Sequence, residues 1–169
     1  MKNVTRSSVH RMAAMILTAA LAVPAAAQNH VPFKGTMQGY DSHAGFPSPT
    51  TVVLATSARG VATLLGQFSL TQEATIDLTT FTATGSAHWT AANGDSIDTT
   101  IVGSAQLSDI PDLLEVTEIH TITGGAGRFA GAQGSFTVTR VHNQIPGDDG
   151  TYSTYGSFSG VMTPPGAAH

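Results

Sequence analysis

Two consecutive stretches of the chain alternate apolar and polar residues with a period of two. Over 68–78, Phe, Leu, Gln, Ala, Ile and Leu alternate with Ser, Thr, Glu, Thr and Asp; over 81–92, Phe, Ala, Gly, Ala, Trp and Ala alternate with Thr, Ser and His. This period places successive side chains on opposite faces of an extended chain, so each stretch predicts a β-strand with one buried face. The only strong helical apolar run lies within the first 27 residues. The remainder of the chain is therefore predicted to be all-β.

Eight segments carry strand patterns, separated at short intervals by turn residues. They are residues 31–39, 50–56, 62–78, 81–92, 96–105, 114–123, 133–142 and 152–162, with a loop rich in glycine and proline at 41–49. Eight short antiparallel strands can protect their edges by closing into a barrel or by forming two packed sheets. Because neighbouring strands look hairpin-connected, the sequence favours an eight-stranded antiparallel up-and-down barrel. Such a barrel has an interior just wide enough for side chains or for one small ligand.

The pair Asn93–Gly94 is a strong hairpin signal and allows the register of two strands to be predicted. A two-residue loop would place the core residue Trp89 beside a carboxylate. A three-residue loop over 93–95 would instead place Trp89 beside Thr99 and keep the apolar faces together. The sequence therefore favours the three-residue loop, with Gly94 in the left-handed conformation.

The first 27 residues have the pattern of a secretory signal peptide. A basic start precedes an apolar run at 12–23, and small residues follow up to Ala27. The apolar run is too short for a bilayer span, which needs about 20 residues. We therefore expect export to the periplasm or beyond, with cleavage near Ala27. A single barrel domain is expected over 28–169, with a flexible tail from about residue 163.

The residues after Ala27 are acidic and contain no cysteine. They hold four basic residues against all 11 acidic residues of the chain, and such a surface repels phosphate backbones and anionic lipid. We therefore expect no nucleic-acid partner, and no segment that spans a membrane. The lack of cysteine excludes disulfides, thiol catalysis and Cys-based metal sites, so the fold must be stabilised by core burial and strand pairing.

A glycine-dense segment at 123–134 carries the most specific pattern of the chain, Thr-Gly-Gly-Ala-Gly-Arg-Phe-Ala-Gly-Ala-Gln-Gly. Gly124, Gly125 and Gly127 permit positive φ, and Phe129 can fold back as a plug. The segment resembles the Gly-Gly-x-Gly-x-Phe-x-x-Ala/Val-x-Gly signature of dirigent proteins and allene oxide cyclases, and of exported bacterial proteins of the same barrel superfamily. The resemblance covers roughly residues 32–162 but is sharp only here. It implies an eight-stranded barrel, often oligomeric, with a cavity for an apolar ligand, and it carries over no functional residue.

Glu118, His120 and Arg140 form the candidate polar site. A register in which Ile122 opposes Phe136 would place Glu118 opposite Arg140 on two neighbouring strands. Inside the barrel a pair of opposite charge is tolerated where an unpaired charge is costly, and a carboxylate with an imidazole at a cavity can do acid–base work. Alternatively, these faces point to solvent, and Glu118 and Arg140 form an exposed cross-strand pair worth under about 1 kcal/mol.

Phe68, Phe81 and Trp89 are the apolar candidates. We expect them in the core. The alternative is that they also line a cavity, because the glycine and alanines of 81–92 leave room beside them. No metal and no cofactor are expected, since no close ligand spacing links the histidines of the strands: His88, His120 and His142.

Three functions stay open from the sequence, and no motif favours catalysis. The first is an exported, non-catalytic barrel that binds a small apolar molecule. The second is an isomerase or cyclase that acts on an apolar substrate in the barrel, with Glu118 and His120 as its polar groups. The third is a structural or interaction protein with a solid barrel. Besides a small apolar ligand, a second copy of the chain is the partner considered.

Overall fold

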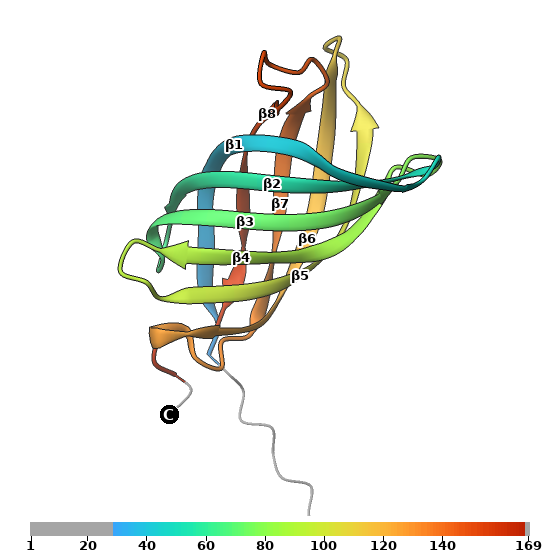
Figure 1. Ribbon diagram of the computed structural model, residues 1–169. Coiled ribbons are helices and arrows are strands. Elements are labelled where there is room, and N and C mark those ends of the chain that lie inside the picture. The colour runs from blue at the N-terminus through green and yellow to red at the C-terminus, as the bar shows by residue number, and fades with distance from the viewer. Residues whose placement is uncertain (1–28, 168–169) are drawn as a thin grey trace, which may run out of the picture.

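The computed structural model describes residues 29–167, in which eight antiparallel strands form a closed barrel (Figure 1). Each strand pairs with its neighbours in sequence, and the last strand returns to pair with the first. The predicted all-β up-and-down barrel is thereby confirmed. The strands are β1 (Val31–Ser48), β2 (Thr51–Ala62), β3 (Gly66–Asp77), β4 (Thr82–Ala91), β5 (Ser96–Leu107), β6 (Leu113–Ala126), β7 (Gly134–Asn143) and β8 (Tyr152–Met162).

β1 is the longest strand and bends around a corner of the barrel. It pairs with β8 from Val31 to Asp41 and with β2 as far as Ser48. Figure 1 shows that β2 to β5 consequently cross β6 to β8 at a steep angle. The prediction of a loop over 41–49 was wrong. The glycine and proline of this segment are accommodated by two shifts of register against β2, after His43 and again after Gly45, rather than by a turn.

A tight turn separates β2 from β3, where one long strand over 62–78 was predicted. The turn residues Thr63, Leu64 and Leu65 include neither glycine nor proline, and Leu64 has a φ of +70°. Leu65 is 4% exposed and belongs to the hydrophobic core. This turn therefore carries apolar residues because it covers one end of the barrel, and its one usual turn signal is Gly66, which begins β3 with a φ of +69°.

The β4–β5 hairpin has a three-residue loop, as predicted, but the register differs by two residues. The loop is closed by Ala91 and Asp95, and Trp89 pairs with Ile97 instead of the predicted threonine. Gly94 has the expected positive φ, +88°. A displacement by two residues leaves the same side chains facing inward, so the alternation alone could not distinguish the two registers.

One end of the barrel is closed by packed aromatic side chains. Phe129, from the short helix η1 (Gly127–Phe129), is 1% exposed and packs into this core, which confirms the predicted plug. Of the three glycines before it, only Gly127 has a positive φ. Five further aromatic residues pack here with ring centroids 5.0 to 5.9 Å apart: Phe33, Phe68, Trp89, Phe136 and Phe158.

The residues after β8 are hydrogen bonded to the connection between β6 and β7. Thr163 N donates to Gln133 O at 2.8 Å, and Gly166 N donates to Arg128 O at 2.7 Å. The predicted signal peptide lies outside the described residues. Within residues 29–167, no helix has the length and apolarity required to cross a bilayer.

Candidate functional site

The half of the barrel opposite the aromatic core contains a buried polar network centred on Arg140 of β7. Arg140 Nε and Nη2 donate to the two carboxylate oxygens of Glu118 at 3.0 and 3.1 Å. Arg140 Nη1 donates to Asp41 Oδ2 and to Thr154 Oγ1, each at 2.9 Å. The planar guanidinium suits such paired contacts with carboxylates. The Arg140 side chain thereby connects β7 with β1, β6 and β8.

The two carboxylates of this network have further partners inside the barrel. Gln72 Nε2 donates to Glu118 Oε1 at 2.9 Å, and Thr56 Oγ1 donates to Asp41 Oδ1 at 2.5 Å. The side chains of Asp41 and Glu118 are 0% and 2% exposed. A buried charge is tolerated only when it is paired and hydrogen bonded, and both carboxylates meet that condition.

Two glycines make room for the central ion pair. Gly103 of β5 lies opposite Glu118, and a Cβ there would be 2.8 Å from Glu118 Cγ. Gly156 of β8 lies opposite Arg140, and a Cβ there would be 2.6 Å from Arg140 Cα. Both contacts are closer than real Cβ atoms allow, so the missing side chains are what permits this packing.

The charges of the network stabilise one another. Burial by itself raises the pKa of Glu118, but the charge and hydrogen bonds of Arg140, together with the neighbouring His120, lower it from 4.5 to about 2. Burial likewise raises the pKa of Asp41, and the hydrogen bond from His142 and the charge of Arg140 bring it below its ordinary value. The network therefore holds two negative charges against the one positive charge of Arg140 at neutral pH.

A pocket of about 290 Å³ lies between this network and the open mouth of the barrel. Its polar inner end is formed by Glu118, Arg140 and His142. A pocket of this size is at the small end of the range of about 300–1,000 Å³ for ligand sites. The walls are mainly apolar or aromatic: Val52, Leu54, Ala74, Ile76, Leu78, Phe81, Ala83, Ala105, Leu114, Val116 and Tyr152, with His43, Ser104 and Gln144 beside them.

His142 connects the network to the pocket. Its Nδ1 lies 2.6 Å from Asp41 Oδ2, and its ring stacks on that of Tyr152 with centroids 5.4 Å apart. Because an ionised carboxylate can only accept, Nδ1 carries the proton of this hydrogen bond. Nε2 then has no hydrogen-bond partner among residues 29–167 and is available to the pocket. A carboxylate that orients an imidazole in this way leaves one ring nitrogen free to bind a ligand or to transfer a proton.

The structure brings Glu118 and Arg140 together inside the barrel, though in a different register from the predicted one. Arg140 pairs with Val116 and Glu118 with Val138 in the β6–β7 ladder, so the predicted opposition was wrong by two residues and the ion pair is diagonal. The alternative of a solvent-exposed pair is also wrong, because Glu118 and Arg140 are 2% and 4% exposed.

His120 is buried but does not line the pocket. Its ring stacks on Phe136 with centroids 5.0 Å apart, and its Nδ1 lies 3.0 Å from Thr99 Oγ1. Its Nε2 is 3.9 Å from Glu118 Oε2, beyond hydrogen-bond distance, and has no partner in the described part of the chain. Its place is at the boundary between the aromatic core and the polar network.

The three apolar candidates occupy two different regions. Phe68 and Trp89 lie in the aromatic core at the closed end. Phe81 lies in the turn between β3 and β4, where it has a φ of +54° and is 42% exposed. The expectation of Phe81 in the core was wrong, because β4 begins one residue later and the ring lies at the pocket mouth.

Sequence reasoning missed Asp41 and Gln72 as members of the site. Asp41 was assigned to a loop, although the inward row that contains Phe33 and Met37 continues with the same period to Asp41. Gln72 was seen on the apolar face of its strand, and an amide in an apolar row was the signal that a buried polar partner is needed. His142 was considered as a metal ligand and was left out of the polar candidates, although it shares a strand face with Arg140. Within residues 29–167, no three His, Asp or Glu side chains are grouped so that they could hold a metal ion.

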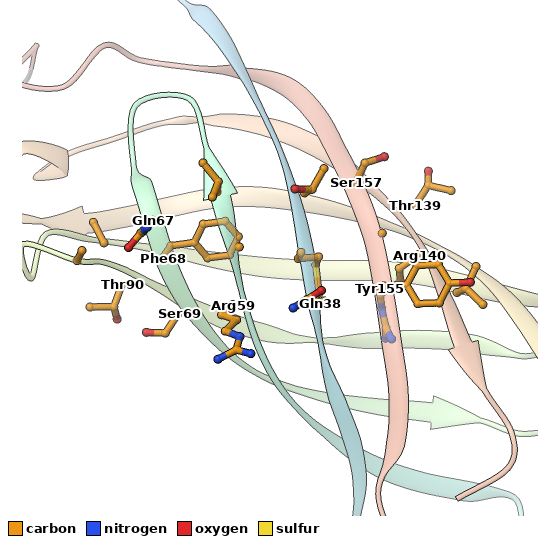
Figure 2. A pocket seen from close by; sticks show the side chains of 18 of the residues that line it. Gln38, Arg59, Gln67, Phe68, Ser69, Thr90, Thr139, Arg140, Tyr155 and Ser157 are labelled. Carbon is orange, nitrogen blue, oxygen red and sulfur yellow. The ribbon is translucent and has the colours of Figure 1, made fainter. Parts of the chain in front are cut away.

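A larger depression, of about 1160 Å³, lies on the outer wall of the barrel. Figure 2 shows Gln38, Arg59 and Tyr155 projecting from neighbouring strands along it. This depression is wide and open to solvent, whereas the pocket at the mouth is more enclosed and has both Glu118 and Arg140 at its inner end. We therefore place the candidate site at the mouth of the barrel.

No protein-family profile, no curated protein and no solved structure matches this chain. Fold and site by themselves define its class: a small closed β-barrel with an apolar pocket at one end and a buried ion network beneath it.

Proposed function

We propose that this protein is exported and binds a small, mainly apolar molecule in the mouth of its barrel. The observation that carries the proposal is the pocket of about 290 Å³, with apolar walls and a polar inner end. Apolar walls supply affinity by burial, at about 25 cal/mol per Å², and a few fixed polar groups determine how the ligand is oriented.

The rim of the mouth supports the same function. Six of the twelve large apolar side chains that are exposed within residues 29–167 lie in the segments around it. Such side chains offer an apolar molecule a contact surface on its way from water into the pocket. These side chains are Phe46, Leu78, Phe81, Leu107, Ile110 and Ile145.

Two features of the sequence also support the proposal. The pattern of residues 1–27 favours export. The glycine segment at 123–134 resembles that of dirigent proteins and allene oxide cyclases, a resemblance that implies a barrel with a cavity for an apolar ligand. We therefore also propose that this protein belongs to the barrel superfamily of dirigent proteins and allene oxide cyclases.

Binding is tested with the protein expressed with its N-terminal segment and purified from the periplasm or medium. Native mass spectrometry and organic extraction would identify a ligand that copurifies. A titration with N-phenyl-1-naphthylamine, a neutral fluorophore that brightens in apolar surroundings, should show saturable binding at one site.

Two alanine-to-phenylalanine variants locate the bound fluorophore. Ala105→Phe adds a ring at the mouth of the pocket and should abolish binding, whereas Ala55→Phe adds the same ring on the outer face of β2 and should not. Absence of saturable binding, or equal binding by both variants, would overturn the proposal.

A second candidate function is acid–base isomerisation or cyclisation of the bound molecule. The observation that favours it is His142, held by Asp41 with Nε2 free toward the pocket. Glu118 is less suited to proton transfer, since its ion pair keeps the carboxylate charged. A copurified ligand incubated with the protein in D2O should then gain deuterium on carbon, and His142→Asn should prevent it. If the ligand mass does not change, the protein is not an isomerase of this kind.

A further inference from the structure

The inner end of the pocket offers an acceptor atom. Four of the five N–H groups of Arg140 are used by Glu118, Asp41 and Thr154. The carboxylates are likewise occupied inside the network. In the neutral imidazole of His142, Nδ1–H is donated to Asp41 and Nε2 is a free acceptor. A ligand that satisfies Nε2 of His142 therefore carries a hydrogen-bond donor.

The inner end also has an excess of negative charge. Asp41 and Glu118 face the single guanidinium of Arg140. A carboxylate that entered the pocket would meet this excess in apolar surroundings, where charges interact more strongly than in water. An ammonium group would be attracted by it.

The rim of the mouth adds charge of the same sign. The strand ends and connections at this end of the barrel carry exposed acidic side chains and, within residues 29–167, no lysine or arginine. The exposed basic residues lie toward the closed end: Lys34 near the start of β1, Arg59 near the end of β2, and Arg128 in η1. The acidic residues around the mouth are Asp77, Asp109, Asp112, Glu115, Asp148 and Asp149.

We infer that the pocket selects an apolar amine, and more generally a hydrogen-bond donor on an apolar body, over the corresponding carboxylate. The inference rests on the proposed binding function and names the chemical class of its ligand. A cleft lined by one sign of charge raises the local concentration of the opposite charge, and the free acceptor of His142 gives the ammonium a fixed contact. An alcohol satisfies the acceptor without the charge and should bind with intermediate affinity.

Three probes that share one apolar body separate the contributions. They are 1-naphthylmethylamine, 1-naphthalenemethanol and 1-naphthoate, compared by calorimetry at low salt and about pH 8. The amine should bind at least about ten-fold more tightly than the carboxylate, and added salt should reduce this ratio. Equal or tighter binding of the carboxylate overturns the inference. If the neutral alcohol binds in that case, the proposed function stands; if none of the three binds, the proposed function fails as well.

Variants that remove a charge without changing the size of the side chain test whether the acidic rim contributes to the selectivity. Asp109→Asn with Asp148→Asn should lower the ratio of amine to carboxylate affinity by at least about three-fold. The control, Glu73→Gln with Asp98→Asn, neutralises two exposed carboxylates away from the mouth and should leave the ratio unchanged. Equal effects of the two double variants would overturn the contribution of the rim.

His142→Asn tests the acceptor. The Asn amide can still donate to Asp41, but it places no acceptor where Nε2 lies. Binding of the amine and the alcohol should weaken, while that of 1-naphthoate should not. A parallel loss for all three probes, with unchanged near-UV circular dichroism, would show that His142 acts by shape alone and would overturn its role as acceptor.

Discussion

Asp41 and Arg140 are 99 residues apart in the sequence and are joined by a hydrogen bond of 2.9 Å inside the barrel. Asp41 lies on β1 and Arg140 on β7, with β8 between them. The Arg140 side chain extends across β8 toward Asp41. In β8, Gly156 pairs with Arg140, and Thr154 Oγ1 accepts a hydrogen bond from its Nη1. This contact therefore connects two strands that share no backbone ladder.

Replacing Arg140 should strongly destabilise the protein. Arg140→Leu leaves Asp41 and Glu118 as uncompensated buried charges, and we expect the free energy of unfolding to fall by about 3–5 kcal/mol in urea titrations. Arg128→Leu is the control, because Arg128 pairs with Asp95 while its side chain is 55% exposed. Its loss should be under about 1 kcal/mol. Similar losses for both variants would contradict a stabilising role of the buried network.

The free energy of unfolding should fall as the pH drops below about 4.5. The pKa of Glu118 is lowered from 4.5 to about 2 in the folded protein, so the unfolded chain binds its proton first on acidification. The ionised Glu118 side chain therefore stabilises the folded protein by about 3 kcal/mol. This contribution is fully present above pH 4.5, the pKa of Glu118 in the unfolded chain, and is lost as the pH falls toward its pKa in the folded protein, about 2. Asp41 contributes in the same direction. Denaturant titrations across this range check the slope, and Glu118→Gln should make it shallower. An equal slope in that variant would exclude Glu118 as its source.

Two glycine-to-alanine variants should differ sharply in stability. A Cβ at Gly156 would overlap Thr139 O and lie 2.6 Å from Arg140 Cα, whereas one at Gly45 has nothing within 4 Å. We expect Gly156→Ala to cost about 1–3 kcal/mol or more, because backbone atoms must move. Gly45→Ala should be nearly neutral or slightly stabilising. The melting temperatures of the two variants and of the unaltered protein test this difference in stability. An unchanged melting temperature for Gly156→Ala would show that the strands can separate there without cost.

Tryptophan fluorescence should report only on the closed end of the barrel. Trp89 is the single tryptophan of the chain and is 0% exposed within the aromatic core. Its Nε1 has no hydrogen-bond partner in residues 29–167. The folded protein should therefore emit at short wavelength, resist quenching by iodide, and keep its spectrum when a probe fills the mouth. Quenching in the native state would contradict the packing around Trp89.

The faces of the strands could be predicted from the sequence, but their registers could not. Alternation identifies which residues point inward, and Trp89 and Phe68 were placed correctly in the core by it. A shift by two residues preserves every inward face, and both predicted registers were displaced by that amount. The difference between such registers depends on how side chains from several strands pack together, which no single segment encodes.

The polar network was harder to predict because its members come from distant strands. Glu118 and Arg140 could be proposed from their positions on neighbouring strands, but Asp41 lies in a segment whose one glycine and two prolines suggest a loop. The pocket depends on small residues such as Ala83 and Ala105, whose contribution is the space that they leave unfilled. That room exists only once all eight strands are in place.

The seam of the barrel joins its first and last strands at the closed end, where Val31 pairs with Met162. The chain is therefore nearly circular in topology. Its ends could be linked there and new ends opened in the loop after Ala91, and every strand ladder would survive this circular permutation. For the same reason, a surface, a tag or a second domain attached through either described end would be held on the side away from the pocket, and the mouth would stay free.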